Sequence, residues 1–141
     1  GIPLGDFLLK QVISELQLTV PSLNQFSTLS PVPGLRRWVD EENIDLEKFE
    51  NDLEKLAATY LVTAKRNNQP RDPVARFHLR NGAQLEQINI DGDLSPKGQS
   101  ESFGVLVNYI YDPETVAENH EAFINEHCLV VSQKISTLIK K

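Results

Sequence analysis

Apolar residues recur every three to five positions in three stretches of the chain, a spacing that places them on one face of a helix. The first stretch covers residues 7–16 and ends before Pro21, which cannot continue a helix interior. The second, residues 46–64, predicts the longest helix, which the polar segment 66–70 ends. The third, residues 130–139, predicts a closing amphipathic helix. Nothing precedes the first helix to cover its apolar face, so we expect the sequence to be a fragment of a longer protein.

Three shorter stretches, residues 25–29, 83–90 and 103–109, are apolar and prone to form β-structure, and predict strands. The first strand is expected to stop at residues 30–34, because their two prolines cannot donate to a sheet ladder. Ser30 would then lie at the C-terminal tip of a strand, a common place for ligand-facing side chains. Since helices and strands interleave, the chain is expected to form a single α+β domain over residues 1–141.

A short helix between Asp72 and Gly82 has both of its ends encoded in the sequence. Asp72 is a preferred N-cap, Pro73 suits the first helical position, and Gly82 suits the position after the C-cap. Val74 and His78 are four residues apart and share a face. The imidazole of His78 is therefore predicted to lie on or beside the buried side of this helix.

Turns and shorter elements connect the predicted strands and helices. Residues 40–45 are acidic and predict a loop, whereas residues 95–96 and 112–113 can each begin a short helix. Residues 91–93 form a turn, Asp-Gly-Asp, that lacks the further acidic positions of a calcium-binding loop. No metal site is predicted there.

Composition and charge exclude several classes of function. The formal net charge of −6 argues against a nucleic-acid partner, which usually requires a basic surface. No apolar run approaches the roughly 18 residues that span a membrane, and neither a secretory leader nor a peroxisomal signal is expected from residues 1–5 and 139–141. A cytoplasmic location is the default expectation. The single cysteine, Cys128, excludes an internal disulfide and a cysteine-based zinc site, and is interpreted as a packed or partly exposed thiol.

Two residues stand out as candidates for chemistry, and each has a purely structural alternative. His78 could act as a general acid or base, because its ordinary pKa lies near neutrality, or it could be a satisfied core residue. His120 and His127 lie among polar residues and are expected to be exposed. Ser30 lacks the Gly-x-Ser-x-Gly context of a hydrolase and could simply cap a turn.

Other polar features could contact a substrate. Gly1 and Gly5 punctuate the entry into the first helix, where exposed backbone N–H groups suit a pyrophosphate, although a plain chain boundary would look the same. Two basic pairs, residues 36–37 and 65–66, could meet phosphate or serve only solubility. Tyr109 and Tyr111 are two residues apart and point to one side of a strand.

Several motifs, in order along nearly the whole chain, resemble the malonyl-CoA decarboxylase family. The longest and most specific is Pro-Val-Ala-Arg-Phe-His-Leu-Arg-Asn-Gly-Ala at residues 73–83. The others are Leu-Gly-Asp-Phe-Leu at residues 4–8, Leu-Ser-Pro-Val-Pro-Gly at residues 29–34 with Trp38 after it, and Asn-Tyr-Ile-Tyr at residues 108–111. The resemblance is weakest over residues 39–60 and the last 20.

The resemblance implies a fold and a reaction. The fold would be the C-terminal portion of a GNAT-type acyl-CoA-binding domain, with a mixed sheet and flanking helices, lacking an upstream helical domain and the first half of the sheet. The reaction would convert malonyl-CoA to acetyl-CoA and carbon dioxide without a metal or organic cofactor. The full-length protein would be a homo-oligomer that binds neither nucleic acid nor membrane.

The resemblance also implies residue roles. The family's catalytic histidine and serine fall on His78 and Ser30, and a supporting tyrosine falls on Tyr111. The implied substrate-binding residues are Gly1, Gly5, Asn81 and Asn108. Pro3 stands where some members carry an acidic residue, and the segment between Trp38 and Leu46 is shorter than in many members.

Two other functions stay open at this point. A GNAT-type site most often serves acyl-CoA-dependent acyl transfer, which would need an acceptor pocket that the sequence does not reveal. The chain could also be an inactive fragment that binds acyl-CoA or another partner.

Overall fold

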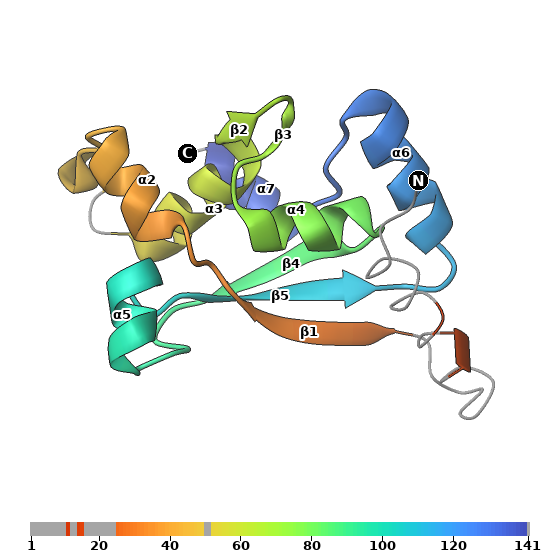
Figure 1. Cartoon of the computed structure of the whole chain (residues 1–141), viewed down its shortest axis with the longest axis horizontal. Helices are drawn as coiled ribbons and strands as arrows, with labels where there is room; N and C mark the ends of the chain where they lie inside the picture. The colour runs from red at the N-terminus through yellow and green to blue at the C-terminus, as the bar shows by residue number, and fades with distance from the viewer. Residues whose placement is uncertain (1–10, 12–13, 16–24, 50–51, 141) are drawn as a thin grey trace.

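The computed structural model describes residues 25–49 and 52–140, together with residues 11, 14 and 15. Three strands form an antiparallel sheet in the order β1-β5-β4 (Figure 1): β1 is Phe26–Pro31, β5 is Leu106–Tyr111 and β4 is Gln84–Asn89. A separate hairpin joins β2 (Lys65–Arg66) to β3 (Gln69–Pro70). The helices are α2 (Leu35–Glu41), η1 (Leu46–Phe49), α3 (Leu53–Thr63), α4 (Pro73–Arg80), α5 (Pro96–Ser102), α6 (Val116–Glu126) and α7 (Gln133–Lys140). The α+β class is thus confirmed.

The sheet is antiparallel rather than mixed. β5 pairs with β1 on one side and β4 on the other, both antiparallel, and the single parallel bridge in the described part of the chain joins Leu85 to Val131. The chain leaves β4 and returns into β5 at the same end, where the Gly104 carbonyl accepts from the backbone N–H of Gly92 and of Asp93. Neighbouring strands joined in this way must run in opposite directions, so the prediction of a mixed sheet is wrong for the described strands.

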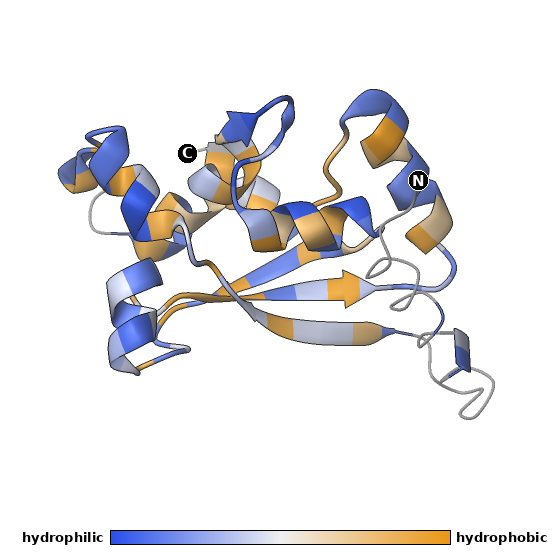
Figure 2. Cartoon of the chain, viewed as in Figure 1, coloured by the Kyte–Doolittle hydropathy of each residue, from blue (hydrophilic) through white to orange (hydrophobic). Residues whose placement is uncertain are grey.

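Helices α3, α4 and α7 lie over one face of this sheet (Figure 1). Apolar and polar bands follow one another along the strands and around α4 (Figure 2), as expected when one side of each element is buried. On β5 the side chains of Val107, Tyr109 and Tyr111 are buried beneath the helices. The prediction that both tyrosines share a side is confirmed, and β1 turns Ser30 to the same covered face while Leu29 is 61% exposed.

The predicted ends of α4 are confirmed. The Asp72 carboxylate accepts a hydrogen bond from the Ala75 backbone N–H at 3.0 Å, Pro73 takes the first helical position, and Gly82 follows the C-cap with a φ of +92°. Helix α6 packs against this end: His120 Nδ1 donates to the Arg80 carbonyl at 2.5 Å. His120 was predicted to be exposed but is half-buried. The reason is that the last carbonyls of a helix have no partner within the helix, and here the His120 ring supplies one.

Elements around the acidic segment differ from prediction. Residues 40–45 are not all loop, because Asp40 and Glu41 complete α2, a helix held by the burial of Trp38 and Val39. The long helix predicted over residues 46–64 is divided into η1 and α3. Asp52 accepts from the Lys55 backbone N–H at 3.1 Å and starts α3 afresh as its N-cap.

Left-handed backbone conformations at two places move other element boundaries. Asn67 and Asn68, with φ of 55° and 64°, turn the chain between β2 and β3 where the sequence predicted only a helix stop. Phe103, with φ of 56°, ends α5, so β5 begins at Leu106 rather than at residue 103. The other predicted short helices and the closing helix are found as α5, α6 and α7, while the helix predicted over residues 7–16 falls mostly outside the described residues.

The described residues hold neither a membrane-spanning helix nor a group of metal ligands. No helix among them is long and apolar enough to cross a membrane. No group of three or more histidine, cysteine or acidic side chains in this part of the chain is arranged to hold a metal ion. His127 is exposed, as predicted, whereas Cys128 is an exposed thiol rather than a packed or partly exposed one.

Gly82→Ala is expected to destabilise the fold strongly. An added Cβ would lie 2.1 Å from the Val116 carbonyl oxygen. The φ of Gly82 is +92°, a backbone conformation that residues other than glycine rarely adopt. We expect the free energy of unfolding, measured by urea denaturation, to fall by about 2 kcal/mol or more. Glu121→Ala, at an exposed position of α6, is the control and should change it by less than about 0.5 kcal/mol. Equal losses for the two variants would contradict close packing of α6 on the end of α4.

Candidate active site

The fold brings Ser30 and His78 into contact from positions 48 residues apart. Ser30 Oγ lies 3.2 Å from His78 Nε2, within hydrogen-bonding distance. The serine faces α4 because it shares the covered side of β1, and the histidine faces the sheet because α4 packs on that side. Thr28, two residues earlier on the same side of β1, places its Oγ1 3.1 Å from Ser30 Oγ. The predicted pair is thus assembled from a strand tip and a short capped helix.

Two tyrosines of β5 hold the imidazole of His78. The Tyr111 hydroxyl lies 2.6 Å from His78 Nδ1, and the Tyr109 ring is stacked on the imidazole with centroids 4.5 Å apart and planes inclined by 23°. The stack fixes the plane of the ring, and the hydrogen bond fixes its rotation within that plane. His78 Nε2 is consequently directed at Ser30 Oγ.

The imidazole is neutral at physiological pH. Burial lowers the pKa of His78 from 6.5 to about 4, because desolvation penalises the charged form. A neutral imidazole donates through one ring nitrogen and accepts through the other. When Tyr111 donates to Nδ1, Nε2 carries the hydrogen and donates toward Ser30. The opposite tautomer reverses both bonds.

The other predicted substrate-binding residues lie away from this pair. Asn81 is fully buried, and its side-chain amide donates to the Phe77 carbonyl at 2.8 Å. Asn108 lies on the opposite face of β5 from Tyr109, where it donates to the Thr28 carbonyl at 3.0 Å. Neither side chain contacts Ser30 or His78 by a hydrogen bond, and their substrate-binding roles stay predictions. Gly1, Gly5 and Pro3 lie outside the described residues.

Sequence reasoning identified Asp72 only as a helix cap and missed its wider role. Its fully buried carboxylate also accepts from the Tyr60 hydroxyl at 3.3 Å and from the Gly34 backbone N–H at 3.4 Å. Burial raises the pKa of the Asp72 carboxyl, and these donors oppose that rise by stabilising the charged form. Burial, together with the charge of Asp72, also raises the pKa of the Tyr60 phenol well above its usual range. No sequence spacing indicates these contacts, because they join three separate elements.

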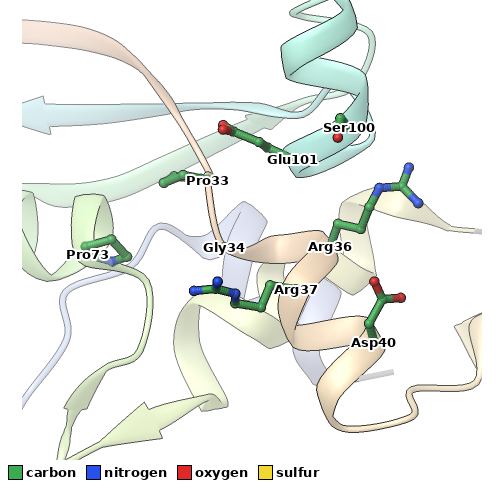
Figure 3. Close-up of a pocket in the computed structure, with 8 residues that line it drawn as sticks. All are labelled: Pro33, Gly34, Arg36, Arg37, Asp40, Pro73, Ser100 and Glu101. Carbon is green, nitrogen blue, oxygen red and sulfur yellow. The ribbon is translucent and has the colours of Figure 1, made fainter.

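A pocket of about 540 Å³ lies between α2, α5 and the start of α4 (Figure 3). Pro33 and Gly34 lie three and four residues after Ser30, and Pro73 begins the helix that carries His78, so the turn after β1 and the start of α4 both line this pocket. Its lining residues are Pro33, Gly34, Arg36, Arg37, Asp40, Pro73, Ser100 and Glu101.

The basic residues of this region are used mainly by the protein itself. Arg36 donates to the Gln99 carbonyl at 3.1 Å and lies 4.0 Å over the ring of Phe103. Arg37 is largely exposed and lies 3.7 Å from the Glu41 carboxylate. Since the pocket also contains two carboxylates, the arginine pair does not form an isolated positive patch.

Comparison with known proteins gives one consistent relationship. The family model described as "Malonyl-CoA decarboxylase C-terminal domain" matches residues 1–48 and 41–141. The chain is 29% identical to the mitochondrial malonyl-CoA decarboxylase of Anser anser anser and 30% identical to that of Rattus norvegicus, covering 100% and 99% of the chain. It spans only 37% and 38% of those two proteins. Their alignments run over 187 and 185 positions for 141 residues, as expected if the relatives hold additional residues where the two family matches meet.

Solved structures of malonyl-CoA decarboxylases share this fold. The enzyme from Rhodopseudomonas palustris superposes with a TM-score of 0.86 at 34% identity, over 97% of this chain and 40% of that one. The enzyme from Agrobacterium vitis gives 0.85 at 36% identity, over 100% of this chain and 42% of that one.

We predict that the imidazole of His78 titrates near pH 4. An NMR titration of the imidazole C–H signals, assigned by their loss in His78→Asn, should show half-protonation close to that value. Because the unfolded chain takes up this proton near pH 6.5, stability contributed by the neutral ring is complete above that pH and is lost as the pH falls toward 4. The free energy of unfolding should therefore fall more steeply over this range in the wild type than in His78→Asn. Titration near pH 6.5 would contradict burial of the ring.

Proposed function

The chain belongs to the malonyl-CoA decarboxylase family, and from this premise we propose that it carries the catalytic residues that convert malonyl-CoA to acetyl-CoA and carbon dioxide. The observation that supports the proposal most directly is the chain of contacts from Ser30 through His78 to Tyr111. These three residues are the ones on which the family's motifs fall, and they come from β1, α4 and β5. The three residues are far apart in sequence, so the fold brings them together and the spacing within a motif does not.

The chemistry requires positioning and a hydrogen-bond donor rather than an electron sink supplied by a cofactor. Loss of carbon dioxide leaves an electron pair that the thioester itself delocalises onto its oxygen. The protein must hold the carboxylate out of the thioester plane, donate where charge develops on the thioester oxygen, and supply a proton to the α-carbon. We propose that these steps need no metal or organic cofactor.

A neutral His78 suits the donor role. With the Tyr111 hydroxyl donating to Nδ1, Nε2–H faces Ser30 and the bound acyl group. Ser30 then accepts from Nε2 and uses its own hydrogen to orient the malonyl group. The bond to the carboxylate carbon breaks, its electron pair passes to the α-carbon and thioester oxygen, and the α-carbon takes one proton. His78 Nε2 delivers that proton while Tyr111 transfers its hydroxyl proton to Nδ1. Solvent then returns one proton to Nε2 as the Nδ1 proton returns to the phenolate, which restores the starting tautomer.

The wider context is proposed on the same basis. We assign the domain to the C-terminal portion of a GNAT-type acyl-CoA-binding fold, and the natural full-length protein to a homo-oligomer. Nucleic acid and membrane are not among the proposed partners. The cytoplasmic location stays a prediction, although the names of the goose and rat relatives include the word mitochondrial.

Two alternatives remain distinguishable by product. An acyl-CoA-dependent acyltransferase would transfer the acyl group to an acceptor, and an acyl-CoA-binding fragment would release no product. The pocket between α2 and α5 has room for an acceptor, but its mixed charges do not favour one. A decarboxylase would form acetyl-CoA and carbon dioxide with no acceptor present.

The proposed function is tested by turnover of malonyl-CoA in the naturally expressed protein, with products identified by mass spectrometry. We expect acetyl-CoA and carbon dioxide from the wild type. His78→Asn and Ser30→Ala should each lower kcat by roughly 10²- to 10⁴-fold, because each removes a group that acts on the developing charge or proton.

Ser27→Ala is the matched control, because Ser27 is an exposed serine of the same strand. It should leave kcat unchanged. Full turnover by His78→Asn would refute the assigned role, and a folded wild type that binds CoA without forming acetyl-CoA would refute the reaction.

A further inference from the structure

Asp72 joins the two elements that carry the proposed catalytic pair. Its carboxylate accepts from the backbone N–H of Gly34, four residues after Ser30, at 3.4 Å. It also accepts from the backbone N–H of Ala75, three residues before His78, at 3.0 Å. A third bond, at 3.3 Å, comes from the Tyr60 hydroxyl of α3. One buried side chain therefore connects β1 and its following turn, α3 and α4.

Close packing makes this junction sensitive to small displacements. Asp72 is completely buried and Tyr60 is 1% exposed, so water cannot replace a lost bond without a rearrangement. At Gly34, an added Cβ would lie 2.4 Å from the Tyr60 hydroxyl and 3.6 Å from the nearer Asp72 oxygen. The turn, the phenol and the carboxylate thus fit together with no space for a methyl group.

The bonds that Asp72 makes are more than helix capping requires. The exposed N-cap of α3, Asp52, accepts from the Lys55 backbone N–H at 3.1 Å in the same manner as Asp72 accepts from Ala75. What distinguishes Asp72 is its burial and its bonds to Gly34 and Tyr60. A cap that needs only one acceptor gains nothing from contacts to two other elements.

We propose that Asp72 is a positioning residue, whose buried carboxylate sets the distance between Ser30 and His78 by fixing the turn after β1 to the first turn of α4. Its hydrogen bonds go to neither Ser30 nor His78, and it acts through the backbone of Gly34 and of Ala75. The same bonds hold Gly34 and Pro73 where they form walls of the neighbouring pocket (Figure 3). The kinetic part of this proposal rests on the proposed function, whereas its structural part does not.

The decisive variant is Asp72→Ser. Serine caps a helix about as well as aspartate but is too short to reach Gly34 and Tyr60, so α4 should form while the junction is lost. We expect kcat for malonyl-CoA to fall roughly 10- to 100-fold, with KM changed less than about threefold, because a small misplacement of catalytic groups reduces rate more than binding. Asp52→Ser, which replaces the matched exposed cap of α3, should leave both constants unchanged.

A second readout does not depend on activity. The NMR titration midpoint of His78 should rise from about 4 toward 6.5 in Asp72→Ser, since a loosened α4 admits water to the ring. In a Ser30→Ala background, Asp72→Ser should cause little further loss of kcat, because the distance it sets no longer matters. A purely structural role would leave the titration unchanged and give additive losses.

Gly34→Ala tests the same junction with Asp72 intact and serves if Asp72→Ser does not fold. The φ of Gly34 is −98°, which alanine adopts readily, so the effect would come from the contact with Tyr60. Unchanged kcat and an unchanged His78 titration in the folded variants would overturn the proposal. If the wild type does not turn over malonyl-CoA, the proposed function fails, and the titration alone decides whether Asp72 positions His78.

Discussion

Stacking of His78 on Tyr109, with the Tyr111 hydroxyl bound to Nδ1, is the interaction on which the rest of the site depends. It attaches a short helix of eight residues to the central strand of the sheet and directs a ring nitrogen at Ser30 on the neighbouring strand β1. A helix this short is not stable alone in water, so its position must come from tertiary contacts. The bonds of Asp72 hold its beginning and α6 holds its end. The imidazole is therefore fixed from three directions before any substrate binds.

The choice of partners also determines the charge of the ring. A carboxylate at Nδ1 would favour the imidazolium form, whereas a phenol leaves the neutral form in place while still fixing the orientation of the ring. Burial acts in the same direction and lowers the pKa of His78 to about 4. Asp72 is the only fully buried carboxylate among the described residues. It accepts hydrogen bonds from backbone N–H groups and a phenol, and none from the imidazole of His78. The structural role of the buried carboxylate, Asp72, is thus separate from the proton-transfer role proposed for His78.

Helix-capping preferences and strand periodicity predicted those features of the fold that depend on residues close together in sequence. The ends of α4 follow from Asp72, Pro73 and Gly82, and the shared side of the two tyrosines follows from strand periodicity, so both could be predicted. The division of the long predicted helix at Asp52 was missed because the apolar spacing continues across it. Pairing of Ser30 with His78 was predicted only from the family resemblance, since 48 residues separate them. The contacts of Asp72 with Gly34 and Tyr60 had no sequence signal, because each residue also satisfies a simpler local role.

The short connection after α2 shows how this architecture tolerates a change of length. The two family matches overlap at residues 41–48, and α2 ends there with Arg71 paired to Glu41 and lying 3.5 Å from Glu42. Arg71 immediately precedes Asp72, so both ends of α2 are tied to the start of α4: Gly34 through the carboxylate and Glu41 through the guanidinium. A change of length beyond Glu42 is therefore expected to leave the distance between Ser30 and His78 unchanged, because both attachments of α2 lie before it.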